Sequence, residues 1–115
     1  MPEKDCLFCK IIAGEINARK VYEDADLFAF EDIRPQAPVH ILIVPKAHIP
    51  TVADFAPDQA DGVGRMVLAA NRIAADKGLS AGYRLVFNCR EQGGQEVFHV
   101  HLHLLGGRPM QWPPG

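Results

Sequence analysis

The sequence His99-Val100-His101-Leu102-His103-Leu104-Leu105 alternates histidine with apolar residues over its first six positions. Because neighbouring side chains of a β-strand point to opposite faces, this alternation predicts a strand, which we extend to residues 97–105. One face of the strand then carries three imidazoles in a row, and the other face packs into the core. Three of the five histidines of the chain lie in this segment, which favours a functional site over a half-exposed surface strand.

The rest of the chain predicts four more strands and two helices. Turn-forming residues separate β-rich segments, which we expect to form strands at residues 19–23, 26–31, 39–44 and 82–88. Residues 57–77 carry an apolar stripe at helical spacing, and residues 5–12 form a second, short amphipathic helix. These elements predict an α+β fold with a five-stranded antiparallel sheet and two helices, as one domain over residues 1–115.

The composition is that of an ordinary globular domain, with 48% hydrophobic and 23% charged residues. The net charge of −2 argues against a nucleic-acid partner, because proteins that bind nucleic acids usually carry a basic surface. No apolar run approaches the roughly 18 residues that span a bilayer, and the first residues do not resemble a signal peptide. We therefore expect no membrane partner and a cytoplasmic location. The odd count of three cysteines argues against a disulfide framework.

Residues 99–105 also match the pattern His-φ-His-φ-His-φ-φ, in which φ is a hydrophobic residue. With this pattern the sequence resembles the histidine triad (HIT) family, and within it the Hint branch, the purine nucleoside phosphoramidases. The resemblance covers nearly the full chain and extends through residues 32–40, 45–49, 94–95, 105–108 and 112–115. It implies a HIT-like fold, a homodimer with a ten-stranded sheet, and hydrolysis of the P–N bond of purine nucleoside phosphoramidates.

The resemblance further implies the roles of side chains around the phosphate. His101, the middle histidine, would attack the α-phosphorus and form a covalent nucleotidyl-histidine intermediate, which water then hydrolyses. His40 would fix the orientation and tautomer of this nucleophile, and His103 would contact the phosphate oxygens. Gln95 and Asn88 would supply further polar contacts to the phosphate.

The nucleoside and the leaving group are expected to lie on either side of this phosphate. Asp32 would accept hydrogen bonds from the ribose hydroxyls. The base would occupy an apolar slot formed by Leu7, Phe8, Ile11 and Phe30. Trp112, in the C-terminal tail, would reach the active site of the partner subunit. Glu96 stands where some Hint relatives carry a serine that helps to protonate the leaving amine, so its part in that step stays open.

Cys6 and Cys9 form a C-x-x-C pair within the short N-terminal helix. At this spacing both thiols point the same way, as two ligands of one metal ion require. The pattern by itself is also compatible with a redox pair or with two buried free thiols. Because some bacterial-type HIT proteins combine such cysteines with two histidines, the resemblance implies a structural zinc ion. Its ligands would be Cys6, Cys9, His48 and His99, and the chemistry itself would need no cofactor.

Three other functions stay open on the sequence alone. Three imidazoles can bind a catalytic zinc ion, although one flat row converges poorly on a tetrahedral site. A second possibility is a purine-nucleotide-binding regulatory or scaffold module in which turnover is incidental. The third is hydrolysis of diadenosine polyphosphates, as in the Fhit branch of the family. The ending Trp112-Pro113-Pro114-Gly115 favours the Hint branch.

Overall fold

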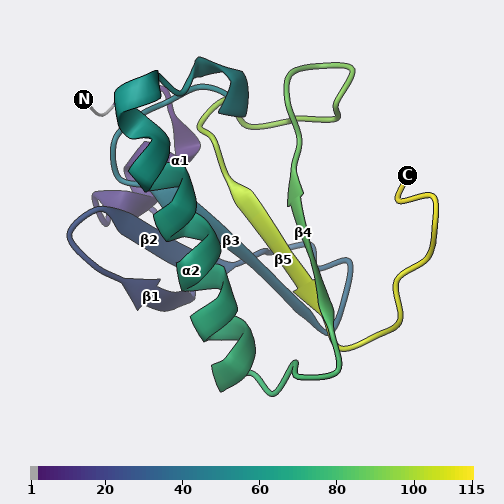
Figure 1. Ribbon diagram of the computed structural model, residues 1–115. Helices are drawn as coiled ribbons and strands as arrows, with labels where there is room; N and C mark the ends of the chain where they lie inside the picture. The colour runs from purple at the N-terminus through teal and green to yellow at the C-terminus, as the bar shows by residue number, and fades with distance from the viewer. Residues whose placement is uncertain (1–2) are drawn as a thin grey trace.

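The computed structural model describes residues 3–115, in which five antiparallel strands form one sheet (Figure 1). The strands are β1 (Lys20–Glu23), β2 (Leu27–Glu31), β3 (Val39–Pro45), β4 (Tyr83–Phe87) and β5 (Leu102–Gly106). Their order across the sheet is β1-β2-β3-β5-β4, so β4 is an edge strand. The helices are α1 (Leu7–Ile12) and α2 (Ala60–Asp76), with the 3-10 turns η1 (Val52–Asp54) and η2 (Pro57–Gln59) between β3 and α2.

The two α-helices pack on opposite faces of the sheet. Ile41 and Ile43 of β3 join Leu104 of β5 in the core beneath α2. Leu42 and Val44, which alternate with Ile41 and Ile43 along β3, belong to a second core that includes the buried residues of α1. This division follows from the alternation of side chains along a strand. The predicted α+β fold, with a five-stranded antiparallel sheet and two helices, is confirmed.

The histidine segment is a regular strand only in its second half. β5 begins at Leu102, so the prediction of a strand over residues 97–105 is wrong for residues 97–101. The reason is a change of hydrogen-bond partner, because the Val100 N–H donates to the carbonyl of Ile49, 2.7 Å away in the loop after β3. The chain therefore approaches β5 alongside that loop rather than along the sheet. Of the three histidines in the segment, the last alone lies in a strand.

The long helix also begins later than predicted. Pro57–Gln59 forms the 3-10 turn η2, and the α-helical hydrogen bonds begin at Ala60. The side-chain oxygen of Gln59 accepts a hydrogen bond of 2.7 Å from the N–H of Ala56, which holds the turn in place. The buried residues of α2 lie between Met66 and Ala74 and recur at helical spacing. They form the predicted apolar stripe against the sheet.

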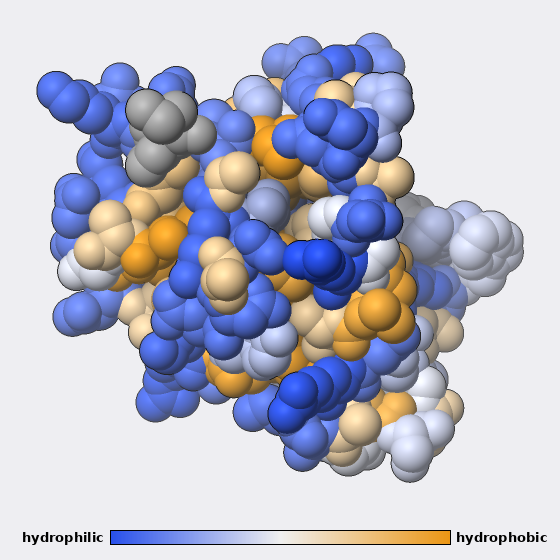
Figure 2. All heavy atoms as spheres, turned by 60° about the vertical axis from the view of Figure 1, so that its left-hand side comes forward, coloured by the Kyte–Doolittle hydropathy of each residue, from blue (hydrophilic) through white to orange (hydrophobic). Residues whose placement is uncertain are grey.

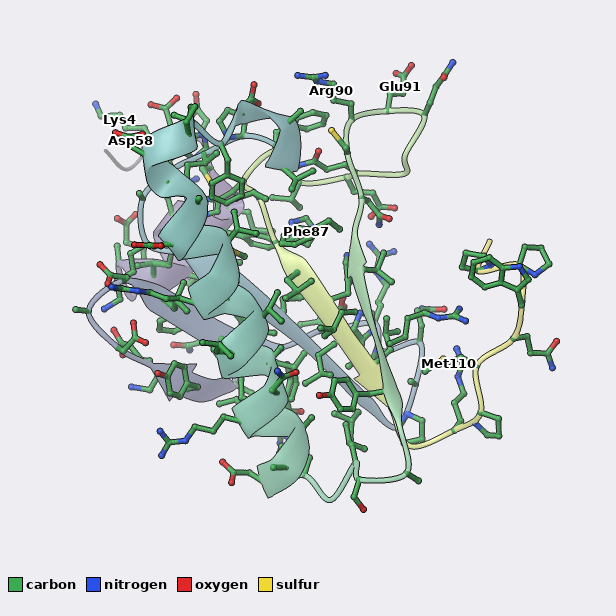
Figure 3. The ribbon with its side chains drawn as sticks, in the orientation of Figure 1. Lys4, Asp58, Phe87, Arg90, Glu91 and Met110 are labelled. Atoms are coloured by element: carbon green, nitrogen blue, oxygen red, sulfur yellow. The ribbon has the colours of Figure 1, made fainter. Side chains whose placement is uncertain are left out.

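The chain that follows β5 extends past the β4 edge of the sheet, where Met110 is labelled in Figure 3. Arg84 of β4 donates a hydrogen bond of 2.6 Å to the carbonyl of Gln111. This bond ties the C-terminal segment to the edge strand.

On the face shown in Figure 2, hydrophobic residues appear as separate patches between hydrophilic side chains. Tyr83 of β4 and Leu68 of α2 are among the large apolar residues with exposed surface.

Within residues 3–115, the structure contains no helix with the length and apolar character needed to cross a membrane.

Candidate active site and metal centre

His101 is a buried, neutral imidazole with one free nitrogen. Its Nδ1 lies 2.8 Å from the carbonyl oxygen of His99, and because a carbonyl only accepts, Nδ1 carries the hydrogen. Burial lowers the pKa of His101 below its usual value, so the ring is uncharged at neutral pH. The free lone pair is therefore on Nε2, which can attack an electrophile such as phosphorus.

His40 and His103 lie beside this residue on the two adjoining strands β3 and β5. The distance between Nε2 of His40 and Nδ1 of His103 is 2.9 Å. The ring of His103 lies 4.9 Å from the ring of His101, measured between centroids. A carboxylate oxygen of Asp32 lies 3.5 Å from Nε2 of His40. The structure thus brings together four of the residues predicted from the sequence.

The hydrogen bonds among these residues differ from the expectation in one respect. His40 was expected to fix the tautomer of His101. In the structure the His99 carbonyl makes the bond that fixes the His101 tautomer, and His40 bonds to His103 instead. The cause is the late start of β5, because the chain before Leu102 bonds to the loop after β3 and brings the main-chain carbonyl of residue 99 within reach of the His101 ring.

His103 is strongly biased toward its neutral form. Its burial, and then the neighbouring imidazoles of His101 and His40, lower the pKa of His103 to about 4. A protonated ring at this position would lie in a poorly solvated environment beside two other groups that can become cations. His103 therefore stays uncharged over the whole range in which a free histidine titrates.

Acidification is expected to destabilise the protein in part through His103. Between pH 6.5 and 4 the unfolded chain binds a proton at this residue, whereas folded His103, with a pKa of about 4, does not. The free energy of unfolding therefore falls as the pH falls through this window, and above pH 6.5 the residue has no effect. Thermal unfolding of wild type and His103→Asn across this range measures the effect, and the variant should have the shallower pH dependence. Equal pH dependence in the two proteins would contradict the prediction.

An aromatic ring from α1 covers one side of His101. The Phe8 centroid lies 5.0 Å from that of His101 and 5.3 Å from that of Phe30 on β2, both in edge-on geometry. Ile11 is buried in the same core, and Leu7 on the outer side of the helix is 43% exposed. Three of the four residues predicted for the base slot therefore pack together, and Leu7 lies at their margin.

Gln95 uses its side-chain amide to hold the loop between β4 and β5. Its oxygen accepts a hydrogen bond of 2.8 Å from the N–H of Arg90. Its nitrogen donates to the carbonyls of Pro50 and Val97 at 2.8 and 3.0 Å. Figure 3 labels Arg90 near the tip of this loop. In this arrangement the Gln95 amide is fully occupied by the main chain, and its predicted contact with phosphate stays a prediction.

The remaining predicted residues are more exposed. Asn88, at the start of the same loop, is half-buried, and Glu96 is exposed. Trp112 is 85% exposed in the C-terminal segment. Within residues 3–115 none of these side chains is close enough to His40, His101 or His103 to make a hydrogen bond with them, and their roles also stay predictions.

Two groups near the histidines were missed by the sequence analysis. The main-chain N–H of Gln36 donates to Nδ1 of His40 at 3.0 Å, and Nε of Arg108 donates to the carbonyl of Gln36 at 3.1 Å. A main-chain amide leaves no signal in residue type. Arg108 ends the segment 105–108 that resembles the family, but nothing in that segment indicates a contact with the loop before β3.

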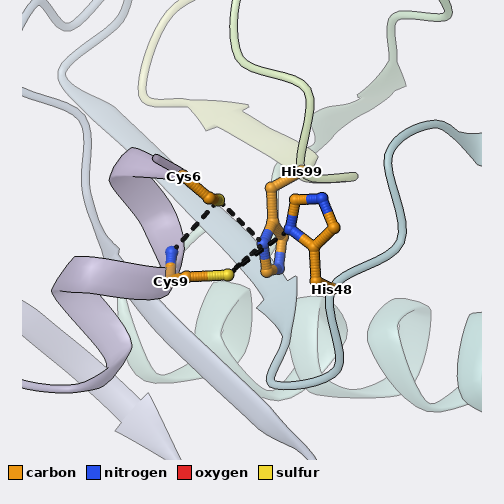
Figure 4. Close-up of side chains that lie close together, drawn as sticks. All are labelled: Cys6, Cys9, His48 and His99. Carbon is orange, nitrogen blue, oxygen red and sulfur yellow. Dashed lines mark hydrogen bonds between the residues drawn. The ribbon is translucent and has the colours of Figure 1, made fainter. Parts of the chain in front are cut away.

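Cys6, Cys9, His48 and His99 converge on one point beside α1 (Figure 4). Nδ1 of His99 lies 3.3 Å from Sγ of Cys6 and 3.4 Å from Sγ of Cys9. Nδ1 of His48 lies 3.4 Å from Sγ of Cys9, and the four ligand atoms lie within 4.8 Å of one another. The prediction that these four residues come together is confirmed.

The geometry of this cluster fits a tetrahedral metal ion. In a tetrahedral site, zinc–sulfur bonds of about 2.3 Å and zinc–nitrogen bonds of about 2.0 Å place sulfur and nitrogen about 3.5 Å apart, close to the distances observed here. Nε2 of His99 lies 2.7 Å from the carbonyl of Pro45, so Nε2 carries the hydrogen and the Nδ1 lone pair faces the cysteines. Burial raises the pKa of the Cys6 thiol, so metal binding would have to displace its proton.

The fold and the two imidazole clusters together define a histidine triad protein. The HIT domain family matches residues 13–110, and the chain belongs to this family. Purine nucleoside phosphoramidase from Escherichia coli K12 is 49% identical over 108 residues, which cover 93% of this chain and 91% of that protein. A HIT-like protein from Synechocystis is 48% identical over 112 residues, which cover 97% and 98% of the two chains.

Solved structures agree with this assignment. A HIT family hydrolase from Legionella pneumophila superimposes with a TM-score of 0.95 at 55% identity, covering 96% of this chain and all of that one. A histidine triad protein from Clostridium difficile has a TM-score of 0.94 at 45% identity, covering 96% and 97% of the two chains. The predictions of a histidine triad protein and of an enzyme are confirmed.

Proposed function

We propose that the chain hydrolyses the P–N bond of purine nucleoside phosphoramidates, or the matching bond of acyl nucleotides such as acyl-AMP. Nε2 of His101 attacks the α-phosphorus, the P–N bond breaks and the amine departs with a proton, whereas an acyl nucleotide loses a carboxylate by cleavage of its P–O bond. Water then cleaves the nucleotidyl-histidine bond and releases the mononucleotide. The hydrogen bond from His101 Nδ1 to the His99 carbonyl carries the proposal, because it leaves Nε2 free to attack. The 49% identity to Escherichia coli purine nucleoside phosphoramidase supports the substrate class.

The other predicted residues contact the phosphate, the ribose, the base or the leaving amine. His103 contacts the phosphate oxygens, with Gln95 and Asn88 nearby, and Asp32 binds the ribose hydroxyls. The base lies against Phe8, whose ring contacts both His101 and Phe30. Leu7 and Ile11 complete the slot. Glu96 interacts with the departing amine.

We also propose that Cys6, Cys9, His48 and His99 bind a structural zinc ion. Two thiolates and two neutral imidazoles suit zinc, and a closed set of four protein ligands is typical of a structural rather than a catalytic site. This arrangement argues against the rival idea of a zinc hydrolase. His99 then binds the metal ion, His101 attacks the phosphorus, and His103 contacts the phosphate oxygens.

The proposed assembly is a homodimer of single-domain subunits, each spanning residues 1–115. β4 is the edge of the sheet and exposes Tyr83, so pairing of two β4 strands would give the ten-stranded sheet. The C-terminal segment lies along this edge, which would place Trp112 near the active site of the partner subunit. We place the protein in the cytoplasm, where Cys6 and Cys9 stay reduced.

A direct comparison of substrates tests the proposal. The wild-type protein is expected to hydrolyse an adenosine phosphoramidate with a kcat/KM at least about 100-fold above that for a diadenosine polyphosphate, because the leaving amine needs little room. The release of mononucleotide from both substrates is measured side by side. A higher kcat/KM for the diadenosine polyphosphate would favour a diadenosine polyphosphate hydrolase. Tight nucleotide binding without hydrolysis of either substrate would favour a regulatory module.

A further inference from the structure

The C-terminal segment holds the loop that precedes β3. Nε of Arg108 donates a hydrogen bond of 3.1 Å to the carbonyl of Gln36. Next to it, Gly107 has φ of +91°, and a Cβ atom there would lie only 2.9 Å from Cβ of Pro38. A larger residue at this position would push Pro38 away and strain the backbone. The loop and the C-terminal segment are therefore fitted closely to each other.

The main-chain amide of Gln36 determines which nitrogen of His40 carries the hydrogen. It lies 3.0 Å from Nδ1 of His40, and because an amide N–H only donates, Nδ1 holds a lone pair. Burial lowers the pKa of His40, so the ring is neutral and its hydrogen is on Nε2. The Nε2–H faces Nδ1 of His103 at 2.9 Å.

The same reasoning then applies to His103. Since Nδ1 accepts the hydrogen bond from His40, the hydrogen of the neutral His103 ring is on Nε2. Within residues 3–115, this Nε2 is the one buried side-chain nitrogen or oxygen that lacks a hydrogen-bond partner. A buried donor without a partner is costly, which indicates a site for an acceptor.

We propose that Arg108 and the main-chain amide of Gln36 are positioning groups that hold His103, through His40, as an Nε2–H donor to the substrate phosphate. This inference rests on the proposed function, in which His103 contacts the phosphate oxygens. With the opposite tautomer, His103 would present a lone pair to an anionic oxygen and repel it. The hydrogen-bond relay formed by Gln36, His40 and His103 therefore selects the productive form before substrate arrives.

A metal ion is a poor alternative for these residues. Asp32, His40 and His103 place ligand atoms within 4.8 Å of one another, as a metal site would. However, Nε2 of His40 carries the hydrogen, and its removal would leave an imidazolate because Nδ1 already accepts from Gln36. His99 has the opposite arrangement, since its Nε2 donates to a carbonyl and its Nδ1 offers a lone pair that a metal ion can accept. The tautomer of His40 therefore fits a hydrogen-bond relay, whereas the tautomer of His99 fits a metal ligand.

The test reads the tautomers directly in the resting protein. Nitrogen-15 NMR distinguishes protonated from unprotonated ring nitrogens of the neutral histidines at pH about 7.5, above their usual titration range. Wild type should show hydrogen on Nε2 of both His40 and His103. His40→Leu removes the donor to His103, which should then lose its fixed Nε2–H form. His40→Gln retains a side-chain donor that can reach the same nitrogen, and should preserve that form.

Arg108→Ala tests the outer end of the relay, with Arg84→Ala as the matched control. Both arginines bond to a main-chain carbonyl, but Arg84 bonds to Gln111 rather than to the loop. Arg108→Ala should give mixed His40 tautomers and reduce kcat/KM for an adenosine phosphoramidate roughly 3- to 10-fold. His40→Leu should reduce it about 100-fold. Arg84→Ala should retain the wild-type tautomers.

The outcomes separate the relay from the proposed function. Hydrogen on Nδ1 of His103 in wild type, or an unchanged His103 tautomer in His40→Leu, would overturn the relay whatever the activity. Unchanged His40 tautomers in Arg108→Ala would overturn the role of Arg108. The predicted tautomers in a protein that hydrolyses no phosphoramidate would support the relay and contradict the proposed function. Metal-dependent shifts of the His40 and His103 signals on addition of zinc alone, in protein already holding zinc at its cysteines, would also overturn the relay.

Discussion

His101→Gly is expected to reduce kcat/KM for a purine nucleoside phosphoramidate by at least about 10⁴-fold, because the variant lacks the atom that bonds to phosphorus. Nucleotide binding should persist, since the substitution leaves in place Asp32, the proposed ribose contact, and Phe8, the centre of the proposed base slot. Binding of AMP is measured by calorimetry, and release of AMP from substrate by chromatography. The buried position of His101 means that the variant has a cavity, so thermal unfolding is measured as well.

The cavity in His101→Gly offers a second readout. Free imidazole can enter the space left by the ring and attack the same phosphorus, which releases the amine and produces a nucleoside phosphorimidazolide. We expect added imidazole to restore part of the turnover and this product to appear by mass spectrometry. In wild type the corresponding adduct is expected on the protein, where rapid denaturation at alkaline pH, which preserves a bond between phosphorus and imidazole, should trap a nucleotidyl group on residue 101.

His103→Gly is the matched control, because it removes an equally sized ring from the same site without removing the nucleophile. Its turnover should fall, but imidazole should yield no phosphorimidazolide, and the trapped nucleotidyl group should remain on His101. Two results would contradict covalent catalysis by His101. One is turnover by His101→Gly within about tenfold of wild type without imidazole. The other is an adduct trapped on a different residue in the wild-type protein.

The sheet and the metal-ligand set were predictable from the sequence because they depend on local patterns. Alternation of apolar residues along β3 determines which side chains lie under α2 and which lie against α1. The helix predicted over residues 5–12 begins at Leu7, with Cys6 as its N-cap, and the i, i+3 spacing brings both thiols to this end of α1, where Sγ of Cys6 accepts a hydrogen bond from the N–H of Cys9. The distant members of the set, His48 and His99, required the family resemblance, since nothing local brings residue 99 to residue 6.

The hydrogen bonds that select histidine tautomers were not predictable. The acceptor for His101 is a main-chain carbonyl, and the donor to His40 is the main-chain amide of Gln36. Every residue except proline offers both groups, so only the path of the chain decides which of them meet. The start of β5 was missed for the same reason, because the alternation continues through residues that bond to the loop after β3 instead of the sheet.

Cys9→Ser is expected to remove the zinc ion and to lower Tm by about 10 °C or more. A ligand present at about 1,000 times its Kd stabilises a protein by about 4 kcal/mol, and 1 kcal/mol corresponds to several degrees in a domain of this size. Wild type purified without added metal should hold about one zinc ion per chain. Elemental analysis and thermal unfolding measure the two effects.

Cys89→Ser is the matched control, because Cys89 is a half-buried free cysteine that lies outside the proposed set of metal ligands. It should retain zinc and nearly the wild-type Tm. A strong chelator should lower the Tm of wild type and of Cys89→Ser, and should leave Cys9→Ser unchanged. Wild type without zinc, or a Tm that a chelator does not change in any of the three proteins, would contradict a structural zinc site.

Loss of zinc should also weaken substrate binding, because the metal ligands and the base slot share α1. Phe8 lies between the two cysteines in the chain, and its ring contacts both His99 and His101, at 6.0 and 5.0 Å. Without the metal, α1 keeps only its apolar contacts with the sheet, and Phe8 is held less firmly. The ring of His101, the proposed nucleophile, is oriented by a main-chain carbonyl. We therefore expect KM to rise several-fold in Cys9→Ser while kcat falls less, and a fall in kcat alone would show that the metal centre supports His101 rather than the base slot.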